Sequence, residues 1–273
     1  MAQRLQADNE SSSNEASGYD AKHEQATEEI ARRIKTKLDF LGVEWAEDDR
    51  SEDEDEGDKR DGKSERKVRL LDYACGTGSM SRIFAPYTTQ CIGIDLSQKM
   101  VETYNARALN QGLSEDEMVG YQGDLCVPAE KNPAAFRDPK FFDFEMACVG
   151  LGFHHFDDPS LAAKRLVSRL KPGGVLMILD FLPHGVYPDA GGHHDHGSSH
   201  HHGHSDKHAD EEDEDQRKAL KTVTHHGFSE ERIKDIFVAA GAGKDFAIEK
   251  LGTVTMGMRH GKRNLFMARG TKA

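Results

Sequence analysis

Two glycines and a downstream acid follow apolar runs within residues 70–95. In the segment LLDYACGTGSMS (70–81), an apolar run leads into a turn that contains Gly76 and Gly78. Glycine lets the backbone approach a ligand closely, and the helix expected after the turn offers N–H groups to an anion. Asp95 ends the next apolar run, 17 residues after Gly78, where a carboxylate can accept both hydroxyls of a ribose. The pattern predicts a nucleoside-containing cofactor.

Two classes of cofactor use this geometry. A dinucleotide places its pyrophosphate on the turn, and its fingerprint requires G-x-G-x-x-G or G-x-G-x-x-A. The frames ACGTGS and GTGSMS do not supply the last small residue of that fingerprint. S-adenosylmethionine places its methionine part on the turn, and Asp124 closes a third apolar run where an acid can accept the adenine amine. These features favour S-adenosylmethionine. A dinucleotide oxidoreductase stays the rival, and it would need a substrate domain.

Strands and helices must alternate to bring these turns to one edge of a sheet. Short apolar runs predict strands at 68–74, 91–96, 118–125, 141–150 and 174–182, and helical patterns lie between most of them at 79–86, 98–112 and 160–170. Boundary signals accompany them at Ser97, Ser114 with Glu117, Asp158 with Pro159, and the KPGG turn at 171–174. Such alternation predicts right-handed crossovers and a mainly parallel sheet.

The C-terminal part adds a hairpin. Ser229 precedes a helical segment that ends at Gly241, and two strand-like runs follow at 245–252 and 263–270. No long crossover separates those two runs, so we expect them to pair antiparallel. The expected fold class is α/β: a doubly wound, Rossmann-like sheet of seven strands, mostly parallel, with a C-terminal antiparallel hairpin.

The chain divides by composition. Residues 1–18 are polar and aperiodic, which predicts a disordered N-terminus. Apolar residues at helical spacing predict one amphipathic cap helix within 19–45, lying over the cofactor cleft; the stripe is Ala26, Ile30, Ile34, Leu38 and Leu41. An acidic linker follows at 46–66. The main domain then spans 67–273 and contains a His-rich and acidic insert at about 184–220, which we also expect to be disordered.

These motifs together resemble the class I S-adenosylmethionine-dependent methyltransferases of the small seven-stranded kind, and in particular fungal members. The resemblance covers roughly 67–183 and 222–270. It implies the cofactor S-adenosylmethionine. The residues that it assigns to the cofactor are Asp72, Ala74, Gly76, Gly78, Asp95, Leu96, Met100, Asp124, Leu125 and Cys148. Ala74 departs from the family by standing at the first glycine of E/D-x-G-x-G-x-G. Some fungal relatives act as regulatory subunits, which implies a protein partner for the N-terminal helix or the insert.

Histidines supply the candidate acid–base groups. His154 and His155 follow the fourth strand, at the carboxyl edge where ligands bind in open α/β folds. Because histidine titrates near neutral pH, we predict that they remove a proton from the methyl acceptor or orient it. His225 and His226, after the insert, are weaker candidates. We assign no metal site, because loose His tracts bind metals without a defined geometry.

Charge and composition exclude several classes. The net charge is −12, and it is concentrated in two blocks at 47–58 and 206–215. The rest of the chain is close to neutral, which argues against nucleic-acid binding by a basic surface. The sequence contains no run of about 18 apolar residues, so we expect no transmembrane helix. The four cysteines show no paired spacing, so we expect a reducing compartment, the cytoplasm or the nucleus. The methyl acceptor is expected to be a small molecule; the alternatives are a protein acceptor, a regulatory subunit, or a cofactor-binding module without turnover.

Overall fold

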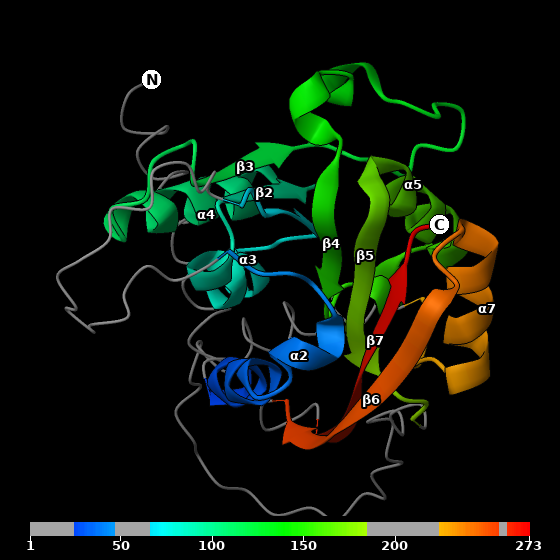
Figure 1. Cartoon of the computed structure of the whole chain (residues 1–273). Helices are drawn as coiled ribbons and strands as arrows, with labels where there is room; N and C mark the ends of the chain where they lie inside the picture. The colour runs from blue at the N-terminus through cyan, green and yellow to red at the C-terminus, as the bar shows by residue number, and fades with distance from the viewer. Residues whose placement is uncertain (1–24, 47–65, 185–223, 257–260) are drawn as a thin grey trace, which may run out of the picture.

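The computed structural model describes residues 25–46, 66–184, 224–256 and 261–273. In them, seven strands form one sheet in the order β3-β2-β1-β4-β5-β7-β6 (Figure 1). The strands are β1 (Arg69–Tyr73), β2 (Gln90–Asp95), β3 (Met118–Gln122), β4 (Phe144–Gly150), β5 (Leu170–Phe181), β6 (Lys244–Thr255) and β7 (Lys262–Thr271). The first five strands pair in parallel, and β7 runs antiparallel to both β5 and β6. The predicted fold class is confirmed.

Helices cover both faces of this sheet. One face carries α5 (Pro159–Arg169) and α7 (Glu230–Ala240), whose apolar residues share one core cluster with Leu71 and Ile178. The other face carries α3 (Ser79–Phe84), α4 (Gln98–Asn110) and the helix at residues 25–35. Neighbouring strand residues alternate between the two clusters: in β4, Met146 and Cys148 face the second layer, whereas Ala147 and Val149 face the first. This two-residue period follows from the strand geometry.

Several boundaries differ from the prediction. β3 stops at Gln122, because Gly123 turns the chain with φ 157° and donates to the Asp95 carbonyl at 2.9 Å. β4 begins only at Phe144, because Asp138 and Pro139 start a short 3-10 helix at Pro139–Phe141. The KPGG segment does not separate α5 from β5 but lies inside β5, where Gly173 and Gly174 bond the backbone of Lys272.

The predicted helix caps are confirmed at three positions. Ser97, Asp158 and Ser229 each accept a hydrogen bond from a backbone N–H in the first turn of α4, α5 and α7. Ser114 and Glu117 do bond each other, at 2.8–2.9 Å. They close a turn before β3 rather than start a helix.

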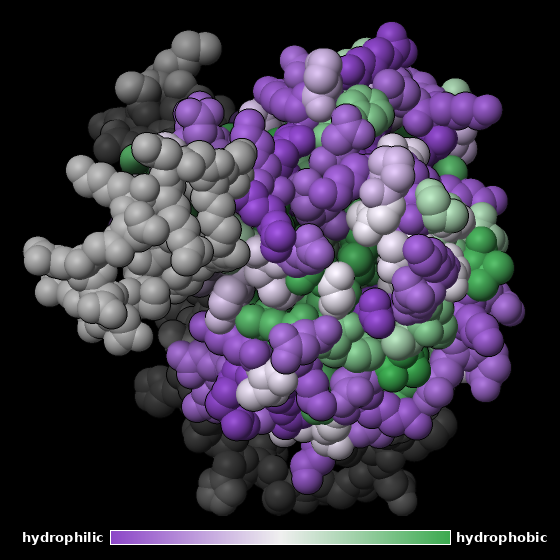
Figure 2. Space-filling view, viewed as in Figure 1, coloured by the Kyte–Doolittle hydropathy of each residue, from purple (hydrophilic) through white to green (hydrophobic). Residues whose placement is uncertain are grey.

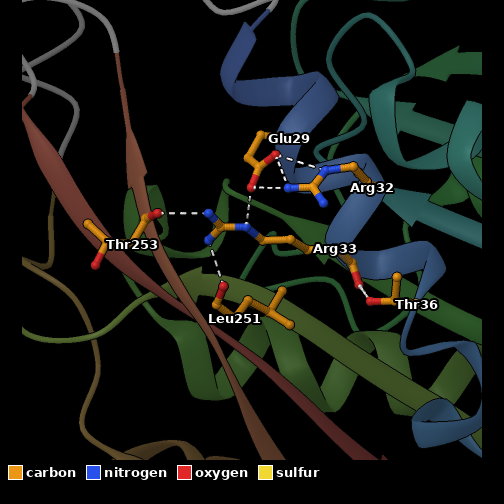
Figure 3. A network of polar contacts seen from close by, with 6 residues as sticks. All are labelled: Glu29, Arg32, Arg33, Thr36, Leu251 and Thr253. Carbon is orange, nitrogen blue, oxygen red and sulfur yellow. Dashed lines mark hydrogen bonds and ion pairs between the residues drawn. The ribbon is translucent and has the colours of Figure 1, made fainter.

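The predicted N-terminal helix is broken into two. Residues 25–35 form one helix and Leu38–Leu41 form α2, with a turn at Thr36 and Lys37. The Thr36 hydroxyl bonds the Arg33 carbonyl at 2.8 Å (Figure 3), a local bond that competes with the helix. The expected apolar stripe is buried, except that Leu38 is only half-buried. Residues 1–18, nearly all of the acidic linker and residues 185–220 of the insert lie outside the described residues.

Arg33 ties this helix to the edge of the sheet. Its guanidinium donates to the Leu251 carbonyl at 2.6 Å and to the Thr253 carbonyl at 2.9 Å, both on the edge strand β6 (Figure 3). Lys37 pairs with Glu249 on the same strand. The two Arg33 bonds pair backbone carbonyls that an edge strand would otherwise leave unpaired. The helix packs at the carboxyl edge of the sheet. Its apolar residues share a core cluster with Leu265 of β7, and Leu265 pairs with Phe181, the last residue of β5.

The face shown in Figure 2 is mostly hydrophilic, and hydrophobic residues gather mainly across its middle. The most exposed large apolar side chains of the described residues are Leu96, Leu109 and Val238. In the part of the chain that the structure describes, no helix combines the length and the apolar character that a membrane span requires.

Arg33→Ala should loosen the N-terminal helix, because it removes a charged donor from two carbonyls, each bond being worth about 1.5–3 kcal/mol. We expect faster hydrogen–deuterium exchange in residues 25–35 and a lower melting temperature. Arg32→Ala is the matched control, since among the described residues Arg32 bonds only Glu29, on the exposed side of the same helix (Figure 3). Equal exchange rates in both variants would contradict the role given to Arg33.

Candidate functional site

The glycine loop between β1 and α3 adopts left-handed backbone at three positions. The φ angles are 55° at Ala74, 52° at Gly76 and 89° at Gly78. A methyl group on Gly76 would meet no atom within 4 Å, so this residue faces open space. Ala74 takes a conformation that costs a non-glycine residue roughly 1–2 kcal/mol. Ala74 thus replaces the first glycine of the family pattern at a modest energetic cost, and the loop keeps its left-handed backbone there.

Asp72 supports this loop from below. Its side chain is buried, and Oδ2 accepts hydrogen bonds from Ser81 N at 3.0 Å and Ser81 Oγ at 2.8 Å in α3. Burial raises the pKa of Asp72 to about 6, although the Ser81 bonds oppose this. The carboxylate thus fixes the first turn of α3, and it accepts hydrogen bonds from Ser81 and from the thiol of Cys148.

Tyr104 of α4 fills the space behind the loop. Its ring is fully buried, and its hydroxyl donates to Ser81 Oγ at 2.8 Å. A methyl group on Gly78 or Gly93 would lie within 2.8 Å of that ring. The second loop glycine is therefore required by packing as well as by its backbone angle.

Asp95 joins the loop after β1 to the loop after β2. Its Oδ2 accepts from Gly76 N and its Oδ1 from Ser97 N, both at 2.8 Å. The side chain is partly exposed, and each carboxylate oxygen has a second lone pair for a ligand hydroxyl. Next to it, Leu96 is 73% exposed. Met100 lies half-buried in the first turn of α4.

Asp124 is held at the end of β3 by Tyr73. The Tyr73 hydroxyl donates to Asp124 Oδ1 at 2.7 Å and accepts from Leu125 N at 3.2 Å. Cys126 N donates to the same carboxylate oxygen at 2.6 Å. Among the described residues, Oδ2 of Asp124 makes no hydrogen bond, and the side chain is partly exposed. Oδ2 can therefore accept from a ligand amine.

The loop donors are used inside the protein. Gly76 N donates to Asp95, Ser81 N to Asp72, and Gly78 N to the Cys75 carbonyl. A pyrophosphate needs N–H groups that are free, and these three are already paired. The arrangement therefore disfavours a pyrophosphate at this turn, whereas Asp95 and Asp124 can still accept from ribose hydroxyls and from an adenine amine.

Like the Asp72 side chain, those of Cys148 and Leu125, which are also assigned to the cofactor, are in the core. Cys148 is completely buried, its Sγ lies 3.7 Å from Asp72 Oδ1, and burial raises the pKa of its thiol well above the usual value. The Leu125 side chain is also buried, at 1% exposure. Any contact of these residues with a ligand must use the backbone.

The loop after β4 packs beside the glycine loop. A methyl group on Gly152 would lie 3.1 Å from the Ala74 side chain, and the rings of Tyr73 and Phe156 are 5.5 Å apart. His154 and His155 lie between Gly152 and Phe156, in a single 3-10 turn. The structure thus brings the candidate acid–base residues to the predicted cofactor site.

The two histidines differ in their surroundings. His154 is 8% exposed, and its Nδ1 lies 2.9 Å from Asp180 Oδ1 on β5. His155 is exposed, with its ring centre 4.1 Å from that of His154. The sequence pattern does not distinguish the two histidines, whereas their burial and their contacts in the structure do.

The described residues that flank the insert hydrogen-bond to the His154 loop or to each other. Thr224 N and His225 N donate to the His154 carbonyl at 3.1 and 3.0 Å, and His184 N donates to the His226 carbonyl. Burial, together with the positive charge of Arg232, lowers the pKa of His225. Within the described ranges, no group of three or more His, Cys, Asp or Glu side chains is arranged to hold a metal ion.

Comparison with known proteins agrees with this arrangement. Residues 71–178 match a family model described as a methyltransferase domain. Over this segment the chain is similar to methyltransferase domains. The matched segment begins within β1 and ends within β5. It therefore contains the glycine loop, Asp95, Asp124 and the His154 loop.

Two curated relatives each match about two fifths of the chain. An uncharacterized methyltransferase of Schizosaccharomyces pombe, C1347.09, is 29% identical over 118 residues, which are 43% of this chain and 40% of the relative. A ubiquinone biosynthesis O-methyltransferase of Xanthomonas euvesicatoria is 31% identical over 111 residues, 41% of this chain and 42% of the relative. The similarity spans about two fifths of each relative.

Solved structures share the fold over a longer stretch. A Haloferax volcanii complex that contains the Trm112 methyltransferase activator gives a TM-score of 0.55 at 14% identity, covering 95% of this chain and 96% of the other. The cyclase SpnF gives 0.50 at 17% identity, covering 76% and 74%. At these identities the likeness shows the fold alone.

Sequence reasoning missed two functional candidates. Tyr73 is the last residue of β1, and its hydroxyl reaches a loop 51 residues further along the chain. Asp180 lies in the run VLMILDF, where a lone acid in a buried strand was a signal that could have been used.

The free energy of unfolding should carry a signature of Asp72. Its folded-state pKa of about 6 exceeds the ordinary 3.8. Between these two pH values the folded state keeps a proton that the unfolded state has lost, so the free energy of unfolding falls as pH rises through 6. Asp72→Asn removes this term, so the stability of the variant relative to the wild type should rise by about 2 kcal/mol from pH 4.5 to 7. Urea unfolding measures it, with the exposed Asp116→Asn as control. If the difference in free energy of unfolding between the variant and the wild type did not change with pH, the raised pKa of Asp72 would be contradicted.

Asp95→Ala should weaken binding of S-adenosylhomocysteine by about 10- to 100-fold, because hydrogen bonds to a charged group are each worth about 1.5–3 kcal/mol. Titration calorimetry measures the affinity. Asp116→Ala makes the same change of charge at the start of β3, on the opposite edge of the sheet. Unchanged affinity in Asp95→Ala would mean that the ribose does not lie there.

Proposed function

We propose that the chain binds S-adenosylmethionine at the glycine loop and transfers its methyl group to a small molecule. The observation that carries the proposal is the bond from Gly76 N to Asp95, which sets the open face of Gly76 beside a carboxylate with lone pairs to spare. In this proposal Asp95 holds the ribose and Asp124 holds the adenine amine. Leu96 and Met100 cover the adenine, as exposed or half-buried apolar side chains can.

The chain itself must position the acceptor and remove its proton. S-adenosylmethionine supplies an electrophilic methyl group on a sulfonium. Holding an acceptor in line with that group contributes roughly 7–11 kcal/mol. The loop at His154 and His155, next to Ala74, is the described segment that brings acid–base side chains to the glycine loop.

We infer further that the acceptor atom is a hydroxyl oxygen. A hydroxyl must lose its proton as it is methylated, and a histidine at this position can accept it. The Xanthomonas relative is named as an O-methyltransferase, which supports the same acceptor class. The cysteine content supports action in the cytoplasm, where thiols stay reduced.

Two other functions fit specific observations. The Haloferax structure with the Trm112 activator supports a chain that works inside a heteromeric complex on a protein or another acceptor. The cyclase SpnF shares the fold, which supports a cofactor-binding chain that transfers no methyl group, since fold does not determine activity.

A label-transfer experiment separates these functions. The full chain is incubated with S-adenosylmethionine carrying a tritiated methyl group and with cell extract divided into metabolite and protein fractions. We expect label in the metabolite fraction, and much less of it with Asp95→Ala at the same concentration of S-adenosylmethionine. Label in protein only would support the protein acceptor, and no label in either fraction would contradict methyl transfer by this chain.

A further inference from the structure

Asp180 is a buried acid that the cofactor site does not use. It lies in β5 between Leu179 and Phe181, and its side chain is 0% exposed. Burying a carboxylate costs several kcal/mol unless hydrogen bonds compensate. Its neighbours in the strand are apolar, so the structure must supply those bonds from elsewhere.

His154 and the backbone supply them. Asp180 Oδ1 accepts from Phe181 N at 2.7 Å, and Oδ2 accepts from His154 N at 3.0 Å. Nδ1 of His154 lies 2.9 Å from Oδ1 and 3.1 Å from Oδ2. Because both oxygens already accept backbone N–H groups, the carboxylate faces the imidazole as an acceptor. Nδ1 then carries the hydrogen, and Nε2 keeps its lone pair.

We infer that Asp180 is a positioning residue that holds His154, and not His155, with Nε2 ready to take the proton from the acceptor hydroxyl. The inference rests on the proposed function. His154 is anchored through Asp180 on β5 and through Thr224 N and His225 N on its carbonyl. The Phe181 ring, 5.2 Å from the imidazole, adds a packing contact. His155 lies on the exposed side of the pair.

The step balances as follows. The hydroxyl oxygen forms a bond to the methyl carbon while the bond from carbon to sulfur breaks, and its electron pair stays on sulfur. The hydroxyl proton moves to Nε2 of His154. The products are a methyl ether, S-adenosylhomocysteine and an imidazolium that pairs with the Asp180 carboxylate. The proton then leaves to water, which restores His154.

The tautomer of His154 can be read directly. Nitrogen-15 NMR of the full chain with labelled histidine, assigned by comparison with His154→Asn, should show hydrogen on Nδ1 and none on Nε2. Asp180→Asn replaces one acceptor oxygen by a donor, so the hydrogen should move to Nε2. Hydrogen on Nε2 in the wild type, or the same tautomer in Asp180→Asn, would overturn the inference.

Label transfer to the metabolite fraction supplies the second readout. Asp180→Asn should lower its rate by about 10²–10⁴-fold while affinity for S-adenosylhomocysteine stays within about twofold. His154→Asn keeps a donor toward Asp180 but lacks Nε2, so it should fold and lose the same activity. Asp116→Asn and the wild type should transfer label at similar rates.

The outcomes separate the two claims. If the wild type transfers label and Asp180→Asn transfers it equally fast, the role of Asp180 is wrong and methyl transfer stands. If the wild type transfers no label to any fraction, the proposed function fails and takes this inference with it.

Discussion

The arrangement of the site depends on one contact, the hydrogen bond from Gly76 N to the Asp95 carboxylate. It joins the loops after β1 and β2 at the carboxyl edge of the sheet, and the Asp95 backbone carbonyl extends the link to Gly123 after β3. Three chain segments are thereby held around one open space. The same bond occupies a loop N–H that a pyrophosphate would require. The contact that joins the two loops therefore also disfavours a dinucleotide cofactor.

Much of the fold could be predicted because short apolar runs, caps and glycines act locally. Ser97, Asp158 and Ser229 begin helices where expected, and the missing crossover before β7 indicated the hairpin. The errors arose where distant partners decide. Gly123 ends β3 by bonding the Asp95 carbonyl, and KPGG joins β5 because Lys272, at the far end of the chain, pairs with it. Neither partner can be identified from the local pattern.

The site shows the same division. Spacing placed Asp95, Asp124 and the glycines correctly at one edge, but it could not separate a ligand contact from a support. Asp72 and Cys148 are buried against each other and shape the loop from behind, whereas Asp124 depends on Tyr73. His154 and His155 are adjacent in sequence, and only the fold shows that Asp180 contacts His154. Two buried acids therefore hold the loops of the site. Asp72 supports the start of α3 after the glycine loop, and Asp180 supports the loop that contains His154.

The central claim is that this edge binds S-adenosylmethionine. Titration calorimetry of the full chain with S-adenosylmethionine, S-adenosylhomocysteine and NAD tests it most directly, because all three ligands contain adenosine and differ in what the glycine loop must accept. The account predicts saturable one-to-one binding of both sulfur ligands and no heat from NAD. Binding of NAD without binding of either sulfur ligand would contradict it.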